Sequence, residues 1–271
     1  MLVALAAMGG MPRDNSVGNV SKVPPPATEF TAPATNAARN NSKNPKAEAV
    51  GPFVTRAKAL NRVDSMRVVV LPFLPELRLH VADSLVALWE SEAREGEPPP
   101  PLPFWSSPWL GGQALARYVL DHPEVVRGRR VLDIGTGSGL VAIAAARAGA
   151  LQVLATDIDA RAIEATRLNA ATNGVTIEVE QHDVLDSSSD ADVILAGDVF
   201  YERALAERVL PFLRRHPLAL AGDPGRVYFP REGVTLLARY DVPTTVEIEG
   251  REVRAAGVYR VERDLSENPP D

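Results

Sequence analysis

The sequence predicts an α/β fold in which a seven-stranded, mainly parallel sheet carries helices on both faces and ends in a C-terminal antiparallel hairpin. Between residues 111 and 222, short apolar runs alternate with segments of helical period, as in parallel strands joined by right-handed helical crossovers. Beyond residue 242, two stretches that favour strands flank Gly250, which indicates a hairpin. In sheets of this kind, ligands bind beyond the carboxyl ends of the strands.

The individual elements follow in chain order. The apolar runs predict parallel strands at 129–135, 151–157, 175–180, 191–197 and 218–222, and hairpin strands at 242–250 and 251–261. The segments between them predict helices at 111–123, 139–150, 158–174 and 202–215. Asp159 is a preferred residue type for the cap of the third of these helices.

By composition, the 271 residues divide into four parts. Residues 1–65 hold eight Lys and Arg against four Asp and Glu, include every lysine of the chain and show no sustained apolar period, so a disordered leader is predicted. Residues 66–110 are predicted to form a strand–helix extension and a loop beside the ligand site, with alternation at Leu77, Leu79 and Val81 marking the strand. Residues 111–265 are predicted as the main domain and 266–271 as a tail.

Three interpretations of residues 1–65 stay open. We favour an extension without function, with Met66 as the natural start. The net positive charge also fits a mitochondrial transit peptide, although the arginines follow no amphipathic spacing. A signal peptide is disfavoured because MLVALAAM lacks a basic start, and eight apolar residues cannot span a membrane. We therefore expect a cytoplasmic protein that does not bind membranes, with the mitochondrial matrix as the alternative location.

Residue counts exclude several kinds of site. The chain has no cysteine, and its four histidines are scattered without metal-ligand spacing, so we expect no metal. Residues 66–271 hold 21 arginines, no lysine and 31 acidic residues, which is the wrong sign for a surface that binds nucleic-acid phosphates. An acidic surface instead favours a basic protein partner.

A glycine-rich turn follows the strand predicted at 129–135. Gly135, Gly137 and Gly139 alternate with Thr136 and Ser138, and the missing side chains let the backbone turn tightly and approach a ligand. The spacing differs from the G-x-G-x-x-G dinucleotide fingerprint, and no lysine is present for a phosphate loop. Phosphate recognition is therefore poorly supported.

Acidic residues at three strand ends indicate the ligand. A carboxylate at Asp133, just before the loop, repels a pyrophosphate but suits a cation such as the sulfonium of S-adenosylmethionine. Asp157 ends the next strand, at the place where an acidic residue accepts bonds from ribose hydroxyls. Ile158 beside it is expected to pack on an adenine face, and Asp183 follows the third strand, where it can accept from the adenine amino group.

Each of these residues also has a plain structural interpretation. The glycine turn can be purely structural, Asp159 is better explained as a helix cap than as a ligand, and Asp183 can be an ordinary loop acid. The order of glycine loop, ribose acid and third acid, each at a strand's carboxyl end, favours binding of S-adenosylmethionine.

Four stretches carry a resemblance to a known family: residues 111–150, the turn at 157–159, LAGDVFYE at 195–202 and AGDPGR at 221–226. Together they resemble the class I methyltransferases. Among these, the chain is most similar to the seven-β-strand protein-lysine methyltransferases that act on the electron transfer flavoprotein β-subunit, and to their bacterial relatives. The resemblance implies a Rossmann-like methyltransferase sheet, S-adenosyl-L-methionine as cofactor and S-adenosyl-L-homocysteine as product.

The resemblance also implies roles for single residues. Asp133, Gly135 and Gly137 would contact the methionine end of the cofactor, Asp157 the ribose and Asp183 the adenine. Trp109 stands where the family has a tryptophan near the cofactor, but here proline precedes it, whereas in the family proline follows it.

Asp198 and Tyr201 form the family's D-x-x-Y signature after the fourth strand. We expect Asp198 to hold the incoming lysine amine and Tyr201 to offer its ring face to the cationic product, with Phe200 as a wall of the channel. The alternative is that Asp198 caps the following helix and Tyr201 packs in its first turn.

The predicted function is therefore transfer of methyl groups to lysine ε-amines of a protein. The first candidate partner is the electron transfer flavoprotein β-subunit and the second a ribosomal stalk protein. A small-molecule N-methyltransferase and a cofactor-binding module without catalysis stay open as alternatives. A nucleic-acid methyltransferase is disfavoured, because Gly-Asp-Val-Phe stands in place of the Asn/Asp-Pro-Pro-Tyr motif.

Overall fold

The protein is built on one seven-stranded sheet, and the computed structural model describes residues 66–94, 96–244, 249–250 and 252–264. The strand order is β5-β4-β3-β6-β7-β9-β8, with β9 antiparallel to both of its neighbours. The bounds are β3 Arg130–Ile134, β4 Gln152–Asp157, β5 Glu178–Gln181, β6 Val193–Gly197, β7 Ala219–Asp223, β8 Val234–Pro243 and β9 Val253–Val261. The predicted α/β fold, with its C-terminal antiparallel hairpin, is confirmed. The predictions for residues 1–65 and 266–271 lie outside the described residues.

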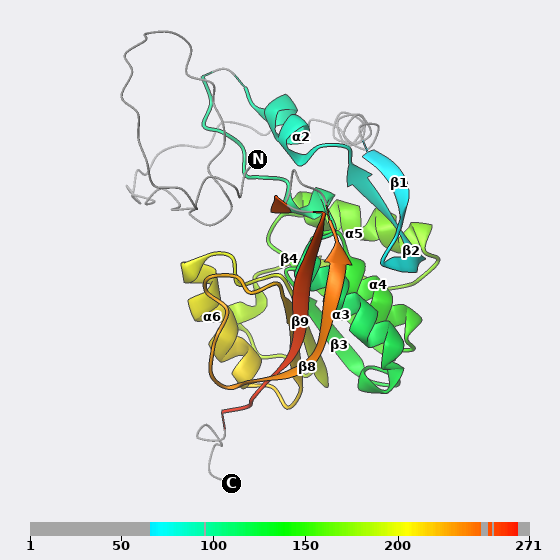
Figure 1. The fold of residues 1–271 in the computed structure, drawn as a ribbon, viewed down its shortest axis with the longest axis vertical. Helices are drawn as coiled ribbons and strands as arrows, with labels where there is room; N and C mark the ends of the chain where they lie inside the picture. The colour runs from blue at the N-terminus through cyan, green and yellow to red at the C-terminus, as the bar shows by residue number, and fades with distance from the viewer. Residues whose placement is uncertain (1–65, 95, 245–248, 251, 265–271) are drawn as a thin grey trace, which may run out of the picture.

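Helices cover the sheet on both faces (Figure 1). One face carries α3 (Leu110–Asp121), α4 (Leu140–Arg147) and α5 (Ala160–Thr172), and the other carries α6 (Arg203–Arg214). Alternate residues of one strand serve the two layers, as the period of two requires. In β6, Leu195 packs with the core under α3 and α4, whereas Ile194 and Ala196 pack with the core under α6.

The N-terminal extension contains a hairpin rather than the single predicted strand. It consists of β1 (Met66–Leu71) and β2 (Leu74–Ala82), and α2 (Leu85–Glu92) follows, capped by Ser84. The inward leucines of β2 pack against α3, α4 and α5. Asn169 of α5 and Asn173, which caps its C-terminus, bind the β2 backbone at His80 and Arg78. The hairpin therefore forms an outer layer over these helices (Figure 1).

The first strand of the C-terminal hairpin was predicted too late in the chain. Residues 242–250 alternate like a strand, but β8 runs from Val234 to Pro243, and residues 245–248 lie outside the described residues. Pairing with β9 and burial of Val242 beside α3 decide the placement. Such tertiary packing outweighs a local strand preference.

Among the described residues, no helix is long and apolar enough to cross a bilayer.

Candidate active site

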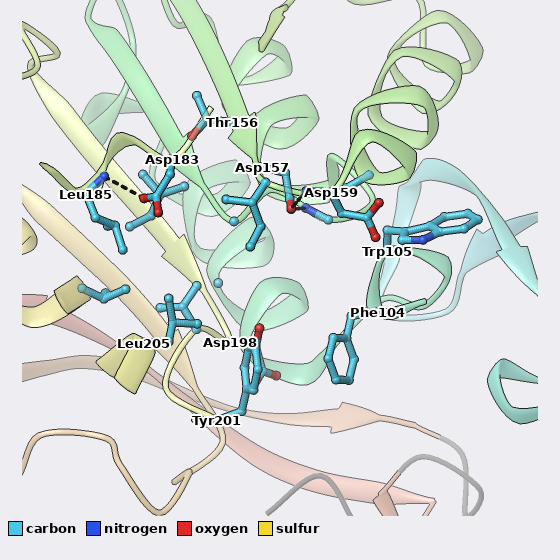
Figure 2. A pocket seen from close by; sticks show the side chains of 18 of the residues that line it. Phe104, Trp105, Thr156, Asp157, Asp159, Asp183, Leu185, Asp198, Tyr201 and Leu205 are labelled. Carbon is cyan, nitrogen blue, oxygen red and sulfur yellow. Dashed lines mark hydrogen bonds between the residues drawn. The ribbon is translucent and has the colours of Figure 1, made fainter. Parts of the chain in front are cut away.

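A cavity of about 340 Å³ lies beyond the carboxyl ends of β3, β4 and β6, at the edge where the sequence places the ligand. Figure 2 shows Asp157, Asp159 and Asp183 along one side of it, with Asp198 and Tyr201 on the other. Eight of the eleven predicted site residues line this cavity: Trp109, Gly135, Gly137, Asp157, Ile158, Asp183, Asp198 and Tyr201.

Three predicted site residues, Asp133, Thr136 and Gly139, do not line the cavity. Asp133 is fully buried behind the glycine loop, where it accepts hydrogen bonds from the Thr136 hydroxyl at 2.6 Å and from the backbone N–H of Ala142 at 3.1 Å. Burial raises the pKa of Asp133 to about 7. In this structure these residues shape the loop, and their direct contact with a cofactor stays a prediction.

The glycine loop needs glycine for its backbone conformation. Gly135, Gly137 and Gly139 have φ values of 60°, 55° and 82°, in the left-handed region that other residues rarely adopt. At Gly139, an added Cβ would also lie 2.9 Å from the Thr166 side chain of α5. The loop thus turns sharply between β3 and α4 and brings its backbone to the cavity.

On the β4–β5 side, each carboxylate keeps a different partner. Asp157 accepts from the backbone N–H groups of Gly137 and Asp159, each at 3.0 Å, and burial raises its pKa. Asp183 pairs with Arg208 of α6 at 2.9 Å, and that bond lowers its pKa. Asp159 caps α5, as its structural interpretation predicted.

This side of the cavity fits the adenosine end of S-adenosylmethionine. The carboxylate of Asp157 lies at the end of β4, next to the Ile158 side chain, which is 71% exposed. A large apolar side chain left bare at a cavity wall is suited to cover an aromatic base. Asp157 can accept from ribose hydroxyls and Asp183 from an exocyclic amine.

Aromatic side chains from the N-terminal extension, residues 66–110, line the side of the cavity that holds Asp198 and Tyr201. Phe104 stacks edge-on against Trp109 and lies 5.3 Å from the Tyr201 ring, centroid to centroid. Trp109 donates its indole N–H to the Phe104 carbonyl. The indole N–H of Trp105 is buried without a hydrogen-bond partner among the described residues. Burial raises the pKa of Tyr201 to about 12, so its hydroxyl stays neutral at physiological pH.

Asp198 is held in one orientation by backbone and side-chain contacts. Among the described residues it is the only one other than glycine with positive φ, at 61°. Its Oδ2 accepts from the backbone N–H of Gly111 at 2.9 Å, and its Oδ1 accepts from Nε of Arg226 at 2.7 Å. A non-glycine residue in this conformation is strained, and such strain clusters at functional sites.

The alternative that Asp198 caps the following helix, with Tyr201 packed in its first turn, is wrong. The helix that follows, α6, begins at Arg203 with Glu202 as its cap residue. Asp198 instead satisfies a free N–H in the first turn of α3, far away in the sequence. Tyr201 precedes the helix and lines the cavity.

Close backbone contact explains the glycines of the sequence motifs. A Cβ on Gly111 would lie 2.2 Å from the carbonyl oxygen of Gly222, and one on Gly197 would lie 2.9 Å from Cα of Gly112. The start of α3 therefore rests directly on the ends of β6 and β7. This contact brings the Gly111 N–H to Asp198.

Arg226 was not named among the site residues from the sequence, although its motif was considered for the substrate side of the pocket; Glu249 was missed and Phe200 was misplaced. Arg226 lines the cavity and joins Asp198 to Glu249, which is 2% exposed and distant in the sequence. Arg226 belonged to the quoted AGDPGR motif, but no local signal marks Glu249. Phe200 is no channel wall, because it is fully buried in the α6 core against Phe229.

The described residues contain no group of three or more metal-binding side chains.

The chain is similar to known methyltransferases over most of its described length. The family model for ribosomal protein L11 methyltransferase (PrmA) matches residues 113–202. The electron transfer flavoprotein beta subunit lysine methyltransferase of Danio rerio is 38% identical over 197 residues, which cover 69% of this chain and 76% of the relative. The chain belongs to the family of electron transfer flavoprotein beta subunit lysine methyltransferases.

More distant relatives extend the comparison. The ribosomal protein L11 methyltransferase of Bacillus pumilus is 35% identical over 144 residues, covering 52% of this chain and 42% of the relative. The solved ribosomal protein L11 methylase from Lactobacillus delbrueckii subsp. bulgaricus covers 55% of this chain and 78% of that chain, at 24% identity and a TM-score of 0.40. As a member of the electron transfer flavoprotein beta subunit lysine methyltransferase family, the protein is an S-adenosylmethionine-dependent protein-lysine N-methyltransferase.

Proposed function

We propose that the protein methylates lysine ε-amines of the electron transfer flavoprotein β-subunit. The observation that carries this proposal is the position of Asp198 and Tyr201 on the same cavity as Gly135, Asp157 and Ile158. One side thus holds groups suited to a nucleoside, and the other presents a carboxylate and an aromatic ring suited to a cationic amine. The relatives named for this activity support the choice of substrate.

The acceptor amine has to be neutral before it reacts. A lysine ε-ammonium has a pKa near 10.4, so the neutral form at pH 7 costs about 4–5 kcal/mol. Its proton leaves to solvent, and the lone pair of the nitrogen then forms the new N–C bond. When bound, S-adenosylmethionine supplies an electrophilic methyl group on a sulfonium, and the electron pair of the broken C–S bond stays on sulfur.

The protein's own residues would align the amine. Asp198 is fixed on two sides, and each of its oxygens can accept a further hydrogen bond from the amine. The ring of Tyr201 is braced by Phe104 and offers its face to the methylated ammonium product, an attraction of about 0.5–2 kcal/mol. Alignment at roughly 3 Å is the larger part of such catalysis.

The decisive experiment combines the purified full-length protein with labelled S-adenosylmethionine and purified electron transfer flavoprotein. We expect label on lysines of the β-subunit, identified by lysine-resolved mass spectrometry. Parallel samples with ribosomal protein L11, with RNA and with a metabolite extract test the alternatives. Label in the metabolites alone would indicate a small-molecule N-methyltransferase, and label in RNA would overturn the predicted exclusion of nucleic acid.

A substitution at Asp198 tests the site itself. In Asp198→Asn the remaining oxygen can still accept from Gly111, but the negative charge is lost, so we expect methyl transfer to fall about 100-fold or more. Affinity for S-adenosylhomocysteine, measured by calorimetry, should change less than about threefold, because Asp198 lies on the acceptor side. Activity equal to that of the wild type would remove Asp198 from the mechanism.

A further inference from the structure

Arg226 joins the acceptor side of the cavity to a buried chain of charges. Its Nε donates to Asp198 at 2.7 Å, and its Nη2 donates to Glu249 at 2.8 Å. Glu249 in turn pairs with Arg254 of β9. The Arg226 side chain is only 13% exposed, and its guanidinium carbon lies 5.8 Å from the centre of the Trp109 ring.

The turn after β7 places Arg226 there. Asp223 is fully buried, and its Oδ1 accepts from the backbone N–H groups of Gly225 and Arg226 at 2.6 and 2.7 Å. Gly225 has a φ of 85°. The D-P-G-R turn is thus closed by its own aspartate, and it directs the following arginine toward Asp198.

A carboxylate beside a lysine amine has two opposed effects on methyl transfer. It orients the amine by a hydrogen bond, but a full negative charge within about 4–6 Å also stabilises the ammonium form. The ammonium has no lone pair and does not react. A guanidinium bound to the same carboxylate offsets the second effect, because a nearby cation disfavours another cation.

We propose that Arg226 is a positioning residue that acts through Asp198: it holds the carboxylate as a neutralised ion pair, so that Asp198 orients the acceptor amine without keeping it protonated. This inference rests on the proposed lysine methylation. It concerns a residue that itself needs no contact with the reacting atoms.

The surrounding charges agree with this role. Among the described residues, Asp223 at the end of β7 and Tyr201 in the loop before α6 also interact electrostatically with Asp198. Asp157 of β4 faces the Tyr201 hydroxyl across the cavity. Burial disfavours the Arg226 cation, yet Asp198 and Glu249 raise its pKa above the usual value. Arg226 therefore stays charged throughout the working range of pH.

A binding experiment tests the inference without any protein substrate. Sinefungin carries an amine where S-adenosylmethionine carries its methyl group, whereas S-adenosylhomocysteine has nothing there. In Arg226→Met the carboxylate of Asp198 loses its counter-ion, so the variant should bind sinefungin about fivefold more tightly relative to S-adenosylhomocysteine than the wild type does. Calorimetry at pH 7.5 measures the ratio of the two affinities.

Two further variants identify the group through which Arg226 acts. The double variant Asp198→Asn with Arg226→Met should return the affinity ratio to the wild-type value or below, because the carboxylate that attracts the amine is gone. Arg226→Lys keeps the charge and should show a ratio between those of the wild type and Arg226→Met. Thermal melts establish that each variant is folded. If Arg226→Met does not fold, the affinity ratio of Arg226→Lys is compared with that of the wild type instead.

The reaction gives an independent measurement. The rise of kcat with pH should move up by about one pH unit in Arg226→Met, because the amine is then harder to deprotonate. Arg117→Gln is the matched control, since Arg117 also pairs with two acids and is 17% exposed, but lies away from the cavity. Its pH profile should equal that of the wild type.

The outcomes separate the inference from the function on which it rests. An unchanged affinity ratio, or a kcat lowered by the same factor at every pH, would overturn the role of Arg226. A wild-type protein that binds the cofactor but labels no lysine would instead overturn the proposed function, and the sinefungin ratio still decides whether Arg226 neutralises Asp198.

Discussion

The two sides of the cavity hold their carboxylates by contacts of different range. On the β4–β5 side, Asp157 and Asp183 are bound by groups within 25 positions in the sequence. On the β6–β7 side, Asp198 is bound by Arg226, 28 positions away, and also by the N–H of Gly111, 87 positions away. The acceptor side thus depends on the long-range contact of Asp198 with Gly111, whereas the two carboxylates of the cofactor side are held by groups 2 to 25 positions away.

The glycines show the same difference. Gly135 and Gly137 are needed for their positive φ, which a tight turn requires. Gly111 and Gly222 instead have ordinary backbone angles and are needed because two backbones touch. A damaged cofactor loop should therefore weaken binding, whereas a damaged α3 contact should disturb the fold and the acceptor side together.

The largest expected effect is that of Gly111→Ala. The added methyl group would lie 2.2 Å from a backbone carbonyl oxygen that no side-chain rotation can move, so we expect a loss of about 3 kcal/mol or more of unfolding free energy. Urea denaturation followed by circular dichroism measures it.

Gly112→Ala is the matched control, one position further along the same helix. Its new methyl group would meet only the Val141 side chain, at 3.9 Å, and replacing a helical glycine should stabilise the protein by about 0.5–1 kcal/mol. Equal stability of the two variants would show that α3 does not rest on β7 as described.

The next effect concerns the pH dependence of stability through Asp133. Its pKa of about 7 lies above the value of 3.8 for a free aspartate, so between these two values the folded state binds more protons than the unfolded chain. Stability should therefore fall as the pH rises through this window and level off above about pH 7. Relative to Asp133→Asn, the wild type should lose about 2–3 kcal/mol between pH 5 and 7.

The comparison with the variant isolates this one group. Burial raises the pKa of Asp223 to about 7 and lowers the pKa of His216, and both groups titrate in both proteins and cancel in the difference. Chemical denaturation at five pH values provides the measurement. A difference that is constant with pH would mean that Asp133 is ionised throughout.

The smallest effect is expected on the cofactor side. Asp157→Asn removes the charge and one acceptor oxygen but keeps the size of the side chain, so affinity for S-adenosylhomocysteine should fall about tenfold with little loss of stability. Asp190→Asn, at a side chain that is 90% exposed and outside the cavity, should leave affinity unchanged. Loss of stability comparable to that of Gly111→Ala would contradict the local character of this side.

The range of the contacts also decides what could be predicted from the sequence. The glycine loop, Asp157 and Asp183 follow strands that the apolar pattern locates, so their places at one sheet edge were predictable. Asp198 was predicted from its motif, but its partner Gly111 was not, since pairing across 87 positions leaves no local trace. Glu249, 23 positions from Arg226, was missed because it lies outside every quoted motif. The strand predicted at 242–250 was displaced because pairing with β9 selected residues 234–243.

The sequence by itself determined the alternation of strands and helices between residues 111 and 222, the seven-stranded sheet and the edge at which the cavity lies, because hydrophobic period and turn residues act over a few positions. Only the tertiary structure decided that Asp133 lies behind the loop, that Phe200 belongs to the core and that Arg226 pairs with Asp198. Burial and charge pairing depend on which segments come into contact, and these contacts form only when the helices pack on the sheet.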